Sequence, residues 1–276
     1  MGGWLRMPAP AKLNLMLRIV GRRADGYHLL QSALDPIDWC DEVRLRRRQD
    51  GRIVRRHGSR SVPPDSDLAV RAARLLQAHA GVRAGAELDL RKRVPMGAGL
   101  GGGSADAAAV LLGLNRLWGL KLARDALSAL ALQLGADVVA LLWQAPVWVA
   151  GIGEQVRALD LPARHYVVIW PGVAAATAGM YAHPDLRRDA LPLDPTAFDP
   201  QRHRDNAFEA LARQLWPQIG AALDWLRAHL PGARLTGSGS ALFAEAPDRA
   251  SACRIARAVP HAWRARACRS WRAPRT

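Results

Sequence analysis

Residues 94–109 read VPMGAGLGGGSADAAA, and this stretch decides how the rest of the chain is interpreted. Five glycines occupy the seven positions from 97 to 103. Because glycine has no Cβ, such a loop can adopt positive φ angles and bring several backbone N–H groups close to one anion. Ser104 and the alanines after it predict the start of a helix, where unpaired N–H groups and the helix dipole attract negative charge. The stretch therefore predicts a phosphate-binding loop.

Two better-known glycine-rich patterns do not fit this loop. Residues 97–102 match the dinucleotide-binding pattern G-x-G-x-x-G, but that site also needs an acidic residue at a strand end about twenty positions later. The nearest candidate, Asp125, lies in a helical pattern instead. The Walker A pattern fits over 97–104 except that Gly103 occupies its lysine position. A flexible surface loop is the simpler alternative, although linkers usually mix glycine with polar residues.

Length and composition indicate an ordinary globular protein. A chain of 276 residues predicts two domains, each large enough to bury a core of its own. The three cysteines, Cys40, Cys253 and Cys268, are scattered and odd in number, which indicates a reducing compartment and argues against a zinc site. The first residues lack the apolar core of a signal peptide, and the most apolar stretch, 138–150, is too short to span a bilayer. We therefore expect a cytoplasmic protein with no membrane partner.

The net charge of +15 raises the alternative of an arginine-rich nucleic-acid-binding protein. Arginine carries this charge, because only three of the 39 basic residues are lysine. The densest basic runs, 44–48 and 55–56, alternate with apolar residues around a turn at 50–51, which predicts a hairpin with one solvated face. The sequence contains no RNA-binding aromatic motif, zinc finger or helix-turn-helix. We therefore expect no nucleic-acid partner, and a charge that attracts polyanionic small molecules.

Hydrophobic periodicity and capping residues predict strands and helices in alternation. Strict alternation over 11–19 predicts a first strand that places Lys12 and Asn14 together on its polar face. The predicted helices are 67–80, 104–114, 123–134 with a left-handed cap at Gly135, 138–142, 207–215, 219–230 and 249–259. The other predicted strands are 87–94, 166–170, two around 151–153, two within 235–243 and one at the end of the chain. A polar stretch with three prolines, 187–204, is the best candidate for a mobile excursion. This order of elements predicts an α+β fold.

A phosphate loop without a dinucleotide signature favours phosphoryl transfer, which needs positioning, charge neutralisation and a group that takes the proton of the acceptor. Lys12 could place a compact ammonium group between acceptor and γ-phosphate, or it could be a solvated strand residue. Asp137 lies where a short helix begins, and its spacing alone favours an N-cap. Residues 237–240, Gly-Ser-Gly-Ser, could form a second anion-binding nest or an ordinary hairpin turn.

Three segments, in this order, resemble the three motifs of the GHMP kinase superfamily: PAKLNL at 10–15, PMGAGLGGGSA at 95–105 and TGSGS at 236–240. Three more resemble one branch of that superfamily: RADGYH at 23–28, LGAD at 134–137 and GIGE at 151–154. That branch phosphorylates the 2-hydroxyl of a cytidylyl methylerythritol intermediate in the non-mevalonate route to isoprenoid precursors. The similarity covers essentially the whole chain.

The resemblance implies a two-domain α+β GHMP kinase fold. Its parts are an N-terminal ribosomal-protein-S5-like α/β domain over 1–160 and a C-terminal ferredoxin-like α+β domain over 161–276, with the active site in the cleft between them. It implies ATP as cosubstrate with Mg²⁺, a small-molecule substrate of the cytidylyl methylerythritol diphosphate type, and a monomer or a homodimer. A kinase of the same superfamily that acts on homoserine or mevalonate is the nearest alternative.

The resemblance also implies roles for single residues. Asp137 is the general base, and Lys12 orients the acceptor hydroxyl and stabilises charge on the moving phosphoryl group. Asn14, Tyr27 and His28 bind substrate. His28 reads the edge of the cytosine, while Tyr27 stacks on the ring with Tyr181 opposite.

The implied ATP site is built around the glycine-rich loop. It consists of Lys92, Pro95, Met96, Gly97, Ala98, Gly99, Leu100, Gly101, Gly102, Gly103, Ser104 and Ala105. Ser104 lies near the phosphates and Mg²⁺, which ATP is expected to hold without a dedicated metal site. The third motif adds Gly237, Ser238, Gly239 and Ser240. Asp67 stands where the family often has an asparagine that contacts adenine.

Overall fold

The structure is a computed structural model that describes residues 3–175 and 177–273. Its described part forms two compact units. Unit 1 comprises the residues up to 11, 40–94 and 101–143, and unit 2 comprises 12–39, 95–100 and the residues from 144 on. Each unit is defined by contacts and consists of several separate chain segments. These units do not test the predicted domains, so the division into 1–160 and 161–276 stays a prediction. No helix among the described residues is long and apolar enough to cross a membrane.

Two long paired strands, β1 (Leu5–Arg22) and β2 (His28–Arg48), contribute residues to both units. The predicted first strand at 11–19 is confirmed and is longer than its alternation indicated. Both of its faces are covered, because Lys12 and Asn14 are as inaccessible to solvent as Leu13 and Leu15 on the opposite face. The alternative that Lys12 is a solvated strand residue is therefore wrong.

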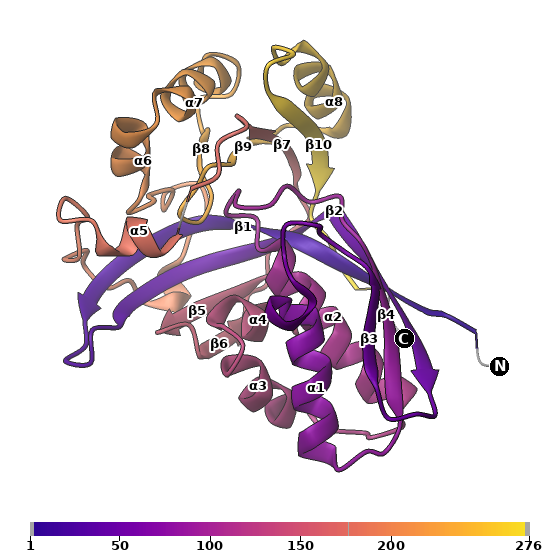
Figure 1. Ribbon diagram of the computed structural model, residues 1–276. Helices are drawn as coiled ribbons and strands as arrows, with labels where there is room; N and C mark the ends of the chain where they lie inside the picture. The colour runs from indigo at the N-terminus through magenta and orange to yellow at the C-terminus, as the bar shows by residue number, and fades with distance from the viewer. Residues whose placement is uncertain (1–2, 176, 274–276) are drawn as a thin grey trace. The chain divides into compact units, whose positions relative to one another are not determined.

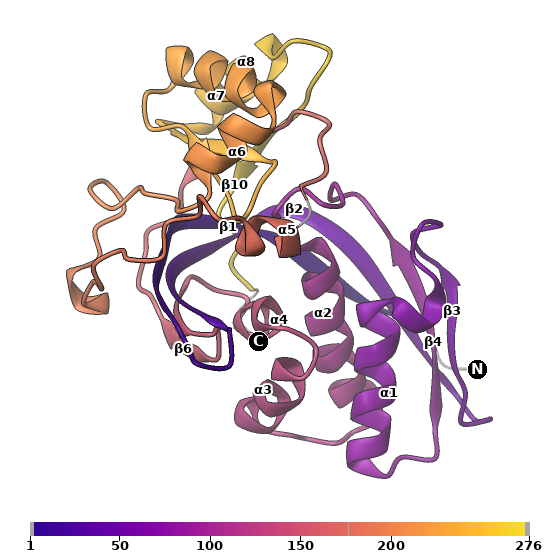
Figure 2. The ribbon, with the colours of Figure 1, turned by 60° about the vertical axis from the view of Figure 1, so that its left-hand side comes forward.

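Unit 1 places helices beside a three-stranded part of the larger sheet, in the order β3-β4-β2 (Figures 1 and 2). Its elements besides β1 and β2 are β3 (Ile53–His57), a 3₁₀ turn (Pro64–Ser66), α1 (Leu68–Ala80), β4 (Gly85–Arg91), α2 (Gly102–Leu117), α3 (Arg124–Leu132) and α4 (Ala136–Leu141). Asp67 caps α1 by accepting a hydrogen bond from the backbone of Ala69, and Gly81 ends the helix at a φ of +61°. Local capping chemistry thus explains why the prediction of this helix is confirmed.

The predicted arginine hairpin is wrong, because β4 lies between its two strands. β4 pairs antiparallel with the end of β2 and parallel with β3, which makes β3, α1 and β4 a crossover unit. Acidic residues on β4 attract basic residues on both neighbours. Arg46 of β2 pairs with Glu87, and Nδ1 of His57 on β3 lies 3.1 Å from Oδ1 of Asp89. The alternation within 44–56 correctly predicts two strands. It cannot reveal that β4, which comes later in the chain, lies between them.

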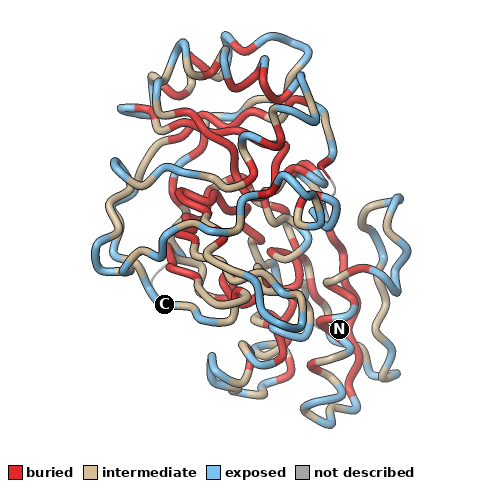
Figure 3. The backbone as a smooth tube through the Cα atoms, turned by 90° about the vertical axis from the view of Figure 1, so that its left-hand side faces the viewer, coloured by how far each residue is buried: buried red, intermediate tan, exposed pale blue. Residues whose placement is uncertain are grey.

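Unit 2 contains a four-stranded antiparallel sheet in the order β10-β7-β9-β8. The elements of unit 2 besides β1 and β2 are β5 (Val147–Gly151), β6 (Gln155–Ala158), β7 (His165–Trp170), α5 (Thr177–Ala182), a 3₁₀ turn (Pro195–Ala197), α6 (Glu209–Leu215), α7 (Pro217–His229), β8 (Arg234–Leu235), β9 (Leu242–Ala246), α8 (Arg249–Ala258) and β10 (Arg264–Arg269). Of these strands, β5 and β6 belong to the larger sheet. Apolar residues of the four-stranded sheet and its helices form one buried cluster, which includes Val167, Leu223 and Leu242. Figure 3 colours the buried segments of the backbone red. The predicted α+β class is confirmed.

A buried carboxylate holds the end of unit 2. Asp35 of β2 has no exposed surface, and its Oδ2 accepts hydrogen bonds from the Tyr166 hydroxyl at 2.8 Å and the Ser270 hydroxyl at 2.6 Å. Its Oδ1 lies 3.0 Å from Nη1 of Arg272. Burial raises the pKa of Asp35, and these three partners oppose that rise. A chain segment after the last strand is thus bonded into the interior.

The segment 187–204 has little regular structure, as its prolines predicted, and it is bonded to β2. Nε2 of Gln31 donates to the Leu193 carbonyl at 3.0 Å, and Oε1 of Gln31 accepts from the Leu193 amide at 2.7 Å. One glutamine side chain therefore satisfies the backbone of one residue of the excursion from both sides.

Candidate active site

The glycine-rich loop directs its carbonyl groups and its amide groups to different partners. The carbonyls bond within the protein: Gly97 accepts from the Ala175 amide (3.1 Å), Ala98 from the Ala241 amide (2.9 Å), Gly99 from Lys12 Nζ (2.8 Å), Leu100 from the Lys12 amide (3.0 Å) and Gly101 from the Ala105 amide (2.8 Å). The amides do not, because no described residue accepts a hydrogen bond from any backbone N–H between 99 and 104. Six consecutive donors are therefore available to an anion.

Gly99 shows why this loop needs glycine. Its φ is +72°, a conformation that residues with a side chain rarely adopt. A Cβ at this position would also lie 2.5 Å from the carbonyl oxygen of Thr236 and 2.8 Å from that of Gly239. The loop therefore packs backbone against backbone with the third motif.

The helix after the loop begins two residues earlier than predicted. α2 starts at Gly102, with Gly101 as its N-cap at a φ of +70°, so Ser104 lies inside the first turn. No side chain caps this end of the helix. The free amides and the positive end of the helix dipole therefore act together at the loop.

Lys12 joins the first motif to the glycine-rich loop. Its side chain is almost fully buried, at 3% exposed, and its Nζ donates to Asn14 Oδ1 at 2.5 Å and to the Gly99 carbonyl at 2.8 Å. A buried ammonium group is costly unless its donors are satisfied, which these two oxygens help to do. Burial and hydrogen bonding thus hold the ammonium group against the loop.

Asn14 joins the first motif to the third. Its backbone amide donates to the hydroxyl of Thr236 at 2.9 Å, and its Nδ2 donates to the hydroxyl of Ser32 at 2.9 Å. The Ser32 hydroxyl in turn donates to the Met16 carbonyl at 2.6 Å. The structure therefore brings parts of all three motifs together within unit 2. Sequence reasoning missed Thr236 and Ser32 as partners, although Thr236 is the first residue of the third motif.

The third motif connects the antiparallel strands β8 and β9 through residues 236–241. Its hydroxyl groups are engaged, because Ser240 donates to the Val173 carbonyl and Ser238 lies 2.9 Å from the hydroxyl of Thr177. Its backbone is partly engaged, since the amides of Gly239 and Ala241 both donate to carbonyls. The hairpin interpretation is confirmed in its connectivity, and the anion-binding nest stays a prediction.

Lys92 belongs to a buried charged cluster at the start of the loop. It pairs with Asp41 and, at 2.5 Å, with Oδ2 of Asp106 on α2. Oδ1 of Asp41 accepts from the Val94 amide at 2.8 Å, so the cluster also fixes the backbone that enters the loop. Sequence reasoning assigned Lys92 to the nucleotide and missed both carboxylates. The signal was available at Asp106, a charged residue in an otherwise apolar helical run.

Competing charges in this cluster shift two pKa values. Burial raises the pKa of Asp106 to about 7, the Lys92 ammonium opposes that rise and the Asp41 carboxylate adds to it. Burial alone would lower the pKa of Lys92, but Asp106 and Asp41 raise it above its ordinary value. Oδ1 of Asp106 is buried and has no partner among the described residues. Asp106 is thus a carboxyl group that carries a proton in part of the molecules near neutral pH.

Asp67 has its carboxylate oxygens occupied inside unit 1. Oδ1 accepts the capping hydrogen bond from the Ala69 amide at 2.9 Å, and Oδ2 lies 2.6 Å from Nη1 of Arg55. The aspartate therefore has a structural role at a position where the superfamily often has an asparagine.

Asp137 does not occupy the N-cap position that its spacing favoured. α4 begins at Ala136, and Gly135 precedes it with φ and ψ both at 152°. Such a conformation is essentially restricted to glycine, so Gly135 also does not form the predicted left-handed cap of the preceding helix. Asp137 is therefore the second residue of α4, and capping does not explain the presence of a carboxylate there.

Two of the four predicted substrate-binding residues pack against each other in unit 2. The rings of His28 and Tyr181 lie 5.0 Å apart between centroids, and the Tyr181 ring meets that of Phe208 edge-on at 4.9 Å. Tyr27, in the turn before β2, is 60% exposed. An aromatic ring that is this exposed leaves a flat apolar surface open to a ligand.

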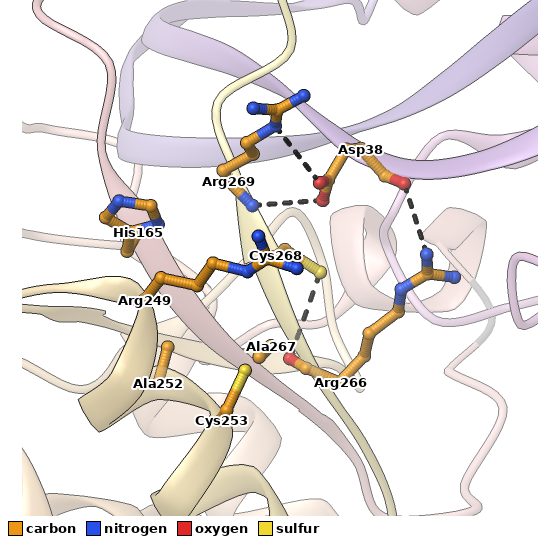
Figure 4. A pocket seen from close by; sticks show the side chains of 9 residues that line it. All are labelled: Asp38, His165, Arg249, Ala252, Cys253, Arg266, Ala267, Cys268 and Arg269. Carbon is orange, nitrogen blue, oxygen red and sulfur yellow. Dashed lines mark hydrogen bonds and ion pairs between the residues drawn. The ribbon is translucent and has the colours of Figure 1, made fainter.

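A separate hollow in unit 2 contains none of the predicted site residues. It measures about 290 Å³ and lies between α8, β10 and Asp38 of β2 (Figure 4). The backbone amide of Arg269 donates to Oδ1 of Asp38 at 3.0 Å, and Arg249 extends across the hollow toward Cys268 (Figure 4). The motifs that the sequence singled out lie elsewhere.

Comparison with known proteins identifies the family. Residues 67–144 match the family model described as GHMP kinases N terminal domain, and residues 186–265 match the model described as GHMP kinases C terminal. A 4-diphosphocytidyl-2-C-methyl-D-erythritol kinase from Aromatoleum aromaticum is 46% identical over 95% of this chain and 92% of its own length. A protein of the same name from Ralstonia nicotianae is 47% identical over 94% of this chain and 91% of its own length.

Solved structures agree at two levels of similarity. The crystal structure of a 4-(cytidine 5'-diphospho)-2C-methyl-D-erythritol kinase shares 34% identity with a TM-score of 0.85, covering 98% of this chain and 100% of that one. A homoserine kinase from Cytophaga hutchinsonii has a TM-score of 0.73 at 20% identity over 98% of this chain and 95% of its own, which shows the shared fold alone. The chain therefore has the two-domain α+β fold of an ATP-dependent kinase that phosphorylates an alcohol, and it belongs to the 4-diphosphocytidyl-2-C-methyl-D-erythritol kinase family of GHMP kinases.

Proposed function

We propose that this kinase transfers the γ-phosphoryl group of ATP to the 2-hydroxyl of 4-diphosphocytidyl-2-C-methyl-D-erythritol, in the non-mevalonate route to isoprenoid precursors. The observation that carries the phosphoryl-transfer part is the loop at 95–104, whose carbonyls bond to the protein while the amides from 99 to 104 stay free. The identity of the acceptor is supported by the relatives of that name, which match the chain over nearly its whole length at 46% and 47% identity.

The loop and the start of α2 are proposed to bind the triphosphate of ATP. Free amides donate to phosphate oxygens without a charged side chain, and the helix dipole adds a favourable field. Lys92 is proposed to lie beside the nucleotide, and residues 237–240 are proposed to contact its phosphates from the third motif. Such a site depends on backbone conformation, which is why glycine is needed at 99.

Mg²⁺ is proposed to arrive with ATP. Among the described residues, no group of three or more His, Cys, Asp or Glu side chains could hold a metal ion alone. Mg²⁺ does not need such a group, because it keeps several waters and binds through substrate phosphates together with few protein ligands. The hydroxyl of Ser104, in the first turn of α2, would be its nearest protein ligand. When bound, the ion neutralises charge on the β- and γ-phosphates.

Asp137 and Lys12 are proposed as the catalytic pair. Asp137 takes the proton of the 2-hydroxyl while the oxygen of that hydroxyl bonds to the γ-phosphorus of ATP. The bond between the γ-phosphorus and the β–γ bridging oxygen breaks, which releases ADP. Lys12 orients the hydroxyl and stabilises the transferred charge, for which a buried ammonium beside the loop carbonyl of Gly99 is suited. Support for Asp137 comes from its position in α4, where it is not a helix cap.

The cytidylyl part of the substrate is proposed to bind at Tyr27, His28 and Tyr181, with Asn14 nearer to the acceptor. His28 reads an edge of the cytosine and the tyrosines stack on its faces, each stacking contact contributing about 0.5–1.5 kcal/mol beyond its buried area. The packed pair of His28 and Tyr181 and the exposed ring of Tyr27 support this assignment.

The test is a comparison of acceptors. ADP release should be fast with the cytidylyl substrate and at background level with homoserine and with mevalonate. Asp137→Asn is the control, because it should abolish turnover with the preferred acceptor and so exclude a contaminating kinase. Release of ADP with homoserine or mevalonate in place of the cytidylyl substrate would overturn the proposal.

We further propose a cytoplasmic enzyme that acts as a monomer or a homodimer. Cys40, Cys253 and Cys268 form no disulfide with one another in the described part of the chain, and a reducing compartment keeps thiols in that state. Cell fractionation and the mass in solution, measured by light scattering, test these two statements.

A further inference from the structure

One guanidinium group holds several parts of the proposed cytidylyl site. Nε of Arg188 donates to Nε2 of His28 at 3.0 Å. Nη1 donates to the Leu186 carbonyl at 2.8 Å, and Nη2 donates to the carbonyls of Tyr181 and His183 at 3.0 and 2.8 Å. Four of the five donors of the side chain are thereby used on neutral acceptors. The guanidinium group of Arg188 is thus fixed in position, and none of these neutral acceptors compensates its charge.

This contact determines the protonation of His28. Arginine does not lose its proton in proteins, so its Nε is always a donor and the nitrogen facing it must offer a lone pair. Nε2 of His28 is therefore unprotonated, and the proton of the neutral ring lies on Nδ1. No other described residue bonds to the ring nitrogens of His28. Arg188 is therefore the contact, among the described residues, that selects this tautomer.

The charges around His28 favour the neutral ring. Burial lowers the pKa of His28, and the guanidinium groups of Arg188 and Arg22 lower it further. The acidic residues nearest in sequence to these contacts are Asp25, Asp185 and Asp189. The carboxylate of Asp25 pairs with Arg23 at 2.7 Å, and Oδ2 of Asp185 lies 3.9 Å from Nδ1 of His183. The ring therefore stays neutral to a lower pH than an ordinary histidine.

We propose that Arg188 is a positioning residue that fixes His28 as the Nδ1–H tautomer, so that the ring presents one hydrogen-bond donor to the acceptor edge of the pyrimidine base of the substrate. This inference rests on the proposed function for the identity of the ligand. Cytosine offers lone pairs at O2 and N3, whereas uracil carries a hydrogen at N3. A donor fixed at Nδ1 is complementary to the first pattern.

The same contacts connect both sides of the proposed base site. Tyr181 lies on α5 and His28 at the start of β2, far apart in sequence. Arg188 bonds to the backbone of the first and the side chain of the second, and their rings lie 5.0 Å apart. Orienting a stacking ring and a hydrogen-bonding ring before the ligand arrives reduces the entropy that binding must overcome.

The tautomer can be measured without substrate. Imidazole ¹⁵N–¹H correlation spectra distinguish protonated from unprotonated ring nitrogens, and a His28→Asn variant identifies the His28 signals. The wild-type ring should be protonated on Nδ1 alone at pH 7.5. Arg188→Ala should show a mixture of tautomers or the Nε2–H form. A wild-type ring protonated on Nε2 would overturn the inference, even if the proposed function is correct.

The consequence for binding is tested by kinetics. Arg188→Ala should raise KM for the cytidylyl substrate about tenfold at pH 8, with KM for ATP and kcat within about twofold, since one hydrogen bond to the base is lost. Arg188→Lys keeps a donor for Nε2 and should raise KM less than about threefold. Arg187→Ala, at the exposed neighbouring arginine, is the matched control and should leave all three constants unchanged.

The pH dependence separates this role from a merely structural one. Once His28 is protonated, both ring nitrogens carry hydrogen and the Nδ1–H donor returns without Arg188. The ratio of KM in Arg188→Ala to KM in the wild type should therefore fall from about tenfold at pH 8 to about threefold or less at pH 5.5. A ratio that is the same at both pH values, or no rise in KM, overturns the inference. A wild-type enzyme that ignores the cytidylyl substrate contradicts the proposed function instead.

Discussion

Residues 95–100 of the first glycine-rich loop lie against the second glycine-rich loop, 236–241, in unit 2, and the two loops satisfy their backbone amides differently. The loop at 95–104 uses its carbonyls to bond to the protein and leaves its amides from 99 to 104 free. The loop at 236–241 bonds through all three kinds of group: the Gly237 carbonyl accepts from Asn206, the Ala241 amide donates to the Ala98 carbonyl, and the Ser240 hydroxyl donates to the Val173 carbonyl. The first loop therefore offers donors to a ligand, and the second mainly supports the first.

Glycine content alone therefore does not predict an anion site. Both loops are rich in glycine and both contain serine, yet only the first has six consecutive amides without an acceptor among the described residues. What distinguishes them is how many of their amides find acceptors within the protein, as those of Gly239 and Ala241 do.

The largest expected effect concerns a residue outside both loops. If the loops only bind and orient, Asp137→Asn should lower kcat by about 10² to 10⁴ and leave KM for ATP within about threefold, because it removes the proton acceptor and keeps the shape. Steady-state kinetics measure both constants. Near-normal turnover would show that the proton goes elsewhere.

Gly99→Ala should impair the first loop strongly. The added Cβ would lie 2.5 Å from the Thr236 carbonyl oxygen at a φ of +72°, so the free amides must move. We expect KM for ATP to rise about 10- to 100-fold and the free energy of unfolding to fall by about 1–3 kcal/mol.

Gly81→Ala is the matched control for that variant. Gly81 has a φ of +61° and open space around its missing Cβ. It should lose about 1 kcal/mol of stability with KM for ATP unchanged. Equal changes in KM for the two variants would contradict the role of Gly99.

Thr236→Val tests the supporting loop. It removes the hydroxyl that accepts from the Asn14 amide at 2.9 Å, and leaves that buried donor unpaired. We expect kcat/KM for the acceptor to fall about 3- to 10-fold, with a smaller change in KM for ATP than Gly99→Ala causes. Thr196→Val, at an exposed threonine, is its control. If KM for ATP changes more in Thr236→Val than kcat/KM for the acceptor does, the second loop is itself the phosphate site.

The smallest expected effect is a difference in pH dependence. The native pKa of Asp106 is about 7 and its reference value is 3.8, so the folded state holds a proton that the unfolded state has released between these values. Stability from this group is therefore full below pH 4 and is lost as the pH rises through 7.

Urea unfolding at pH 5, 6.5 and 8 measures this loss. The wild type should lose roughly 2 kcal/mol more than Asp106→Asn across that range. A variant of the second loop, Ser238→Ala, should shift stability equally at each pH, because that loop is bonded through neutral groups. Parallel curves for the wild type and Asp106→Asn would contradict the assignment.

Local chemistry was predictable from the sequence and long-range pairing was not. The helix predicted at 67–80 and the strand predicted at 11–19 depend on neighbouring residues, and both are confirmed. The arginine hairpin failed because β4 inserts between β2 and β3. The N-cap at Asp137 failed because Gly135 takes that position.

The candidate site shows the same limit. The glycine pattern predicted a loop with free amides, but not that Lys12 and Asn14 would be buried by it. The partner of Asn14, Thr236, is 222 residues away, and no periodicity carries that information. The roles of Asp137, Lys92, Tyr27, His28 and Tyr181 came from the resemblance and stay predictions.

The buried carboxylate of Asp35 has a practical consequence for handling the protein. Because Ser270 and Arg272 bond to it, trimming the chain before residue 270 would strand a charge in the interior. Shortened versions intended for crystallisation should therefore keep these residues. Purification handles and fluorescent labels are better attached at the opposite terminus.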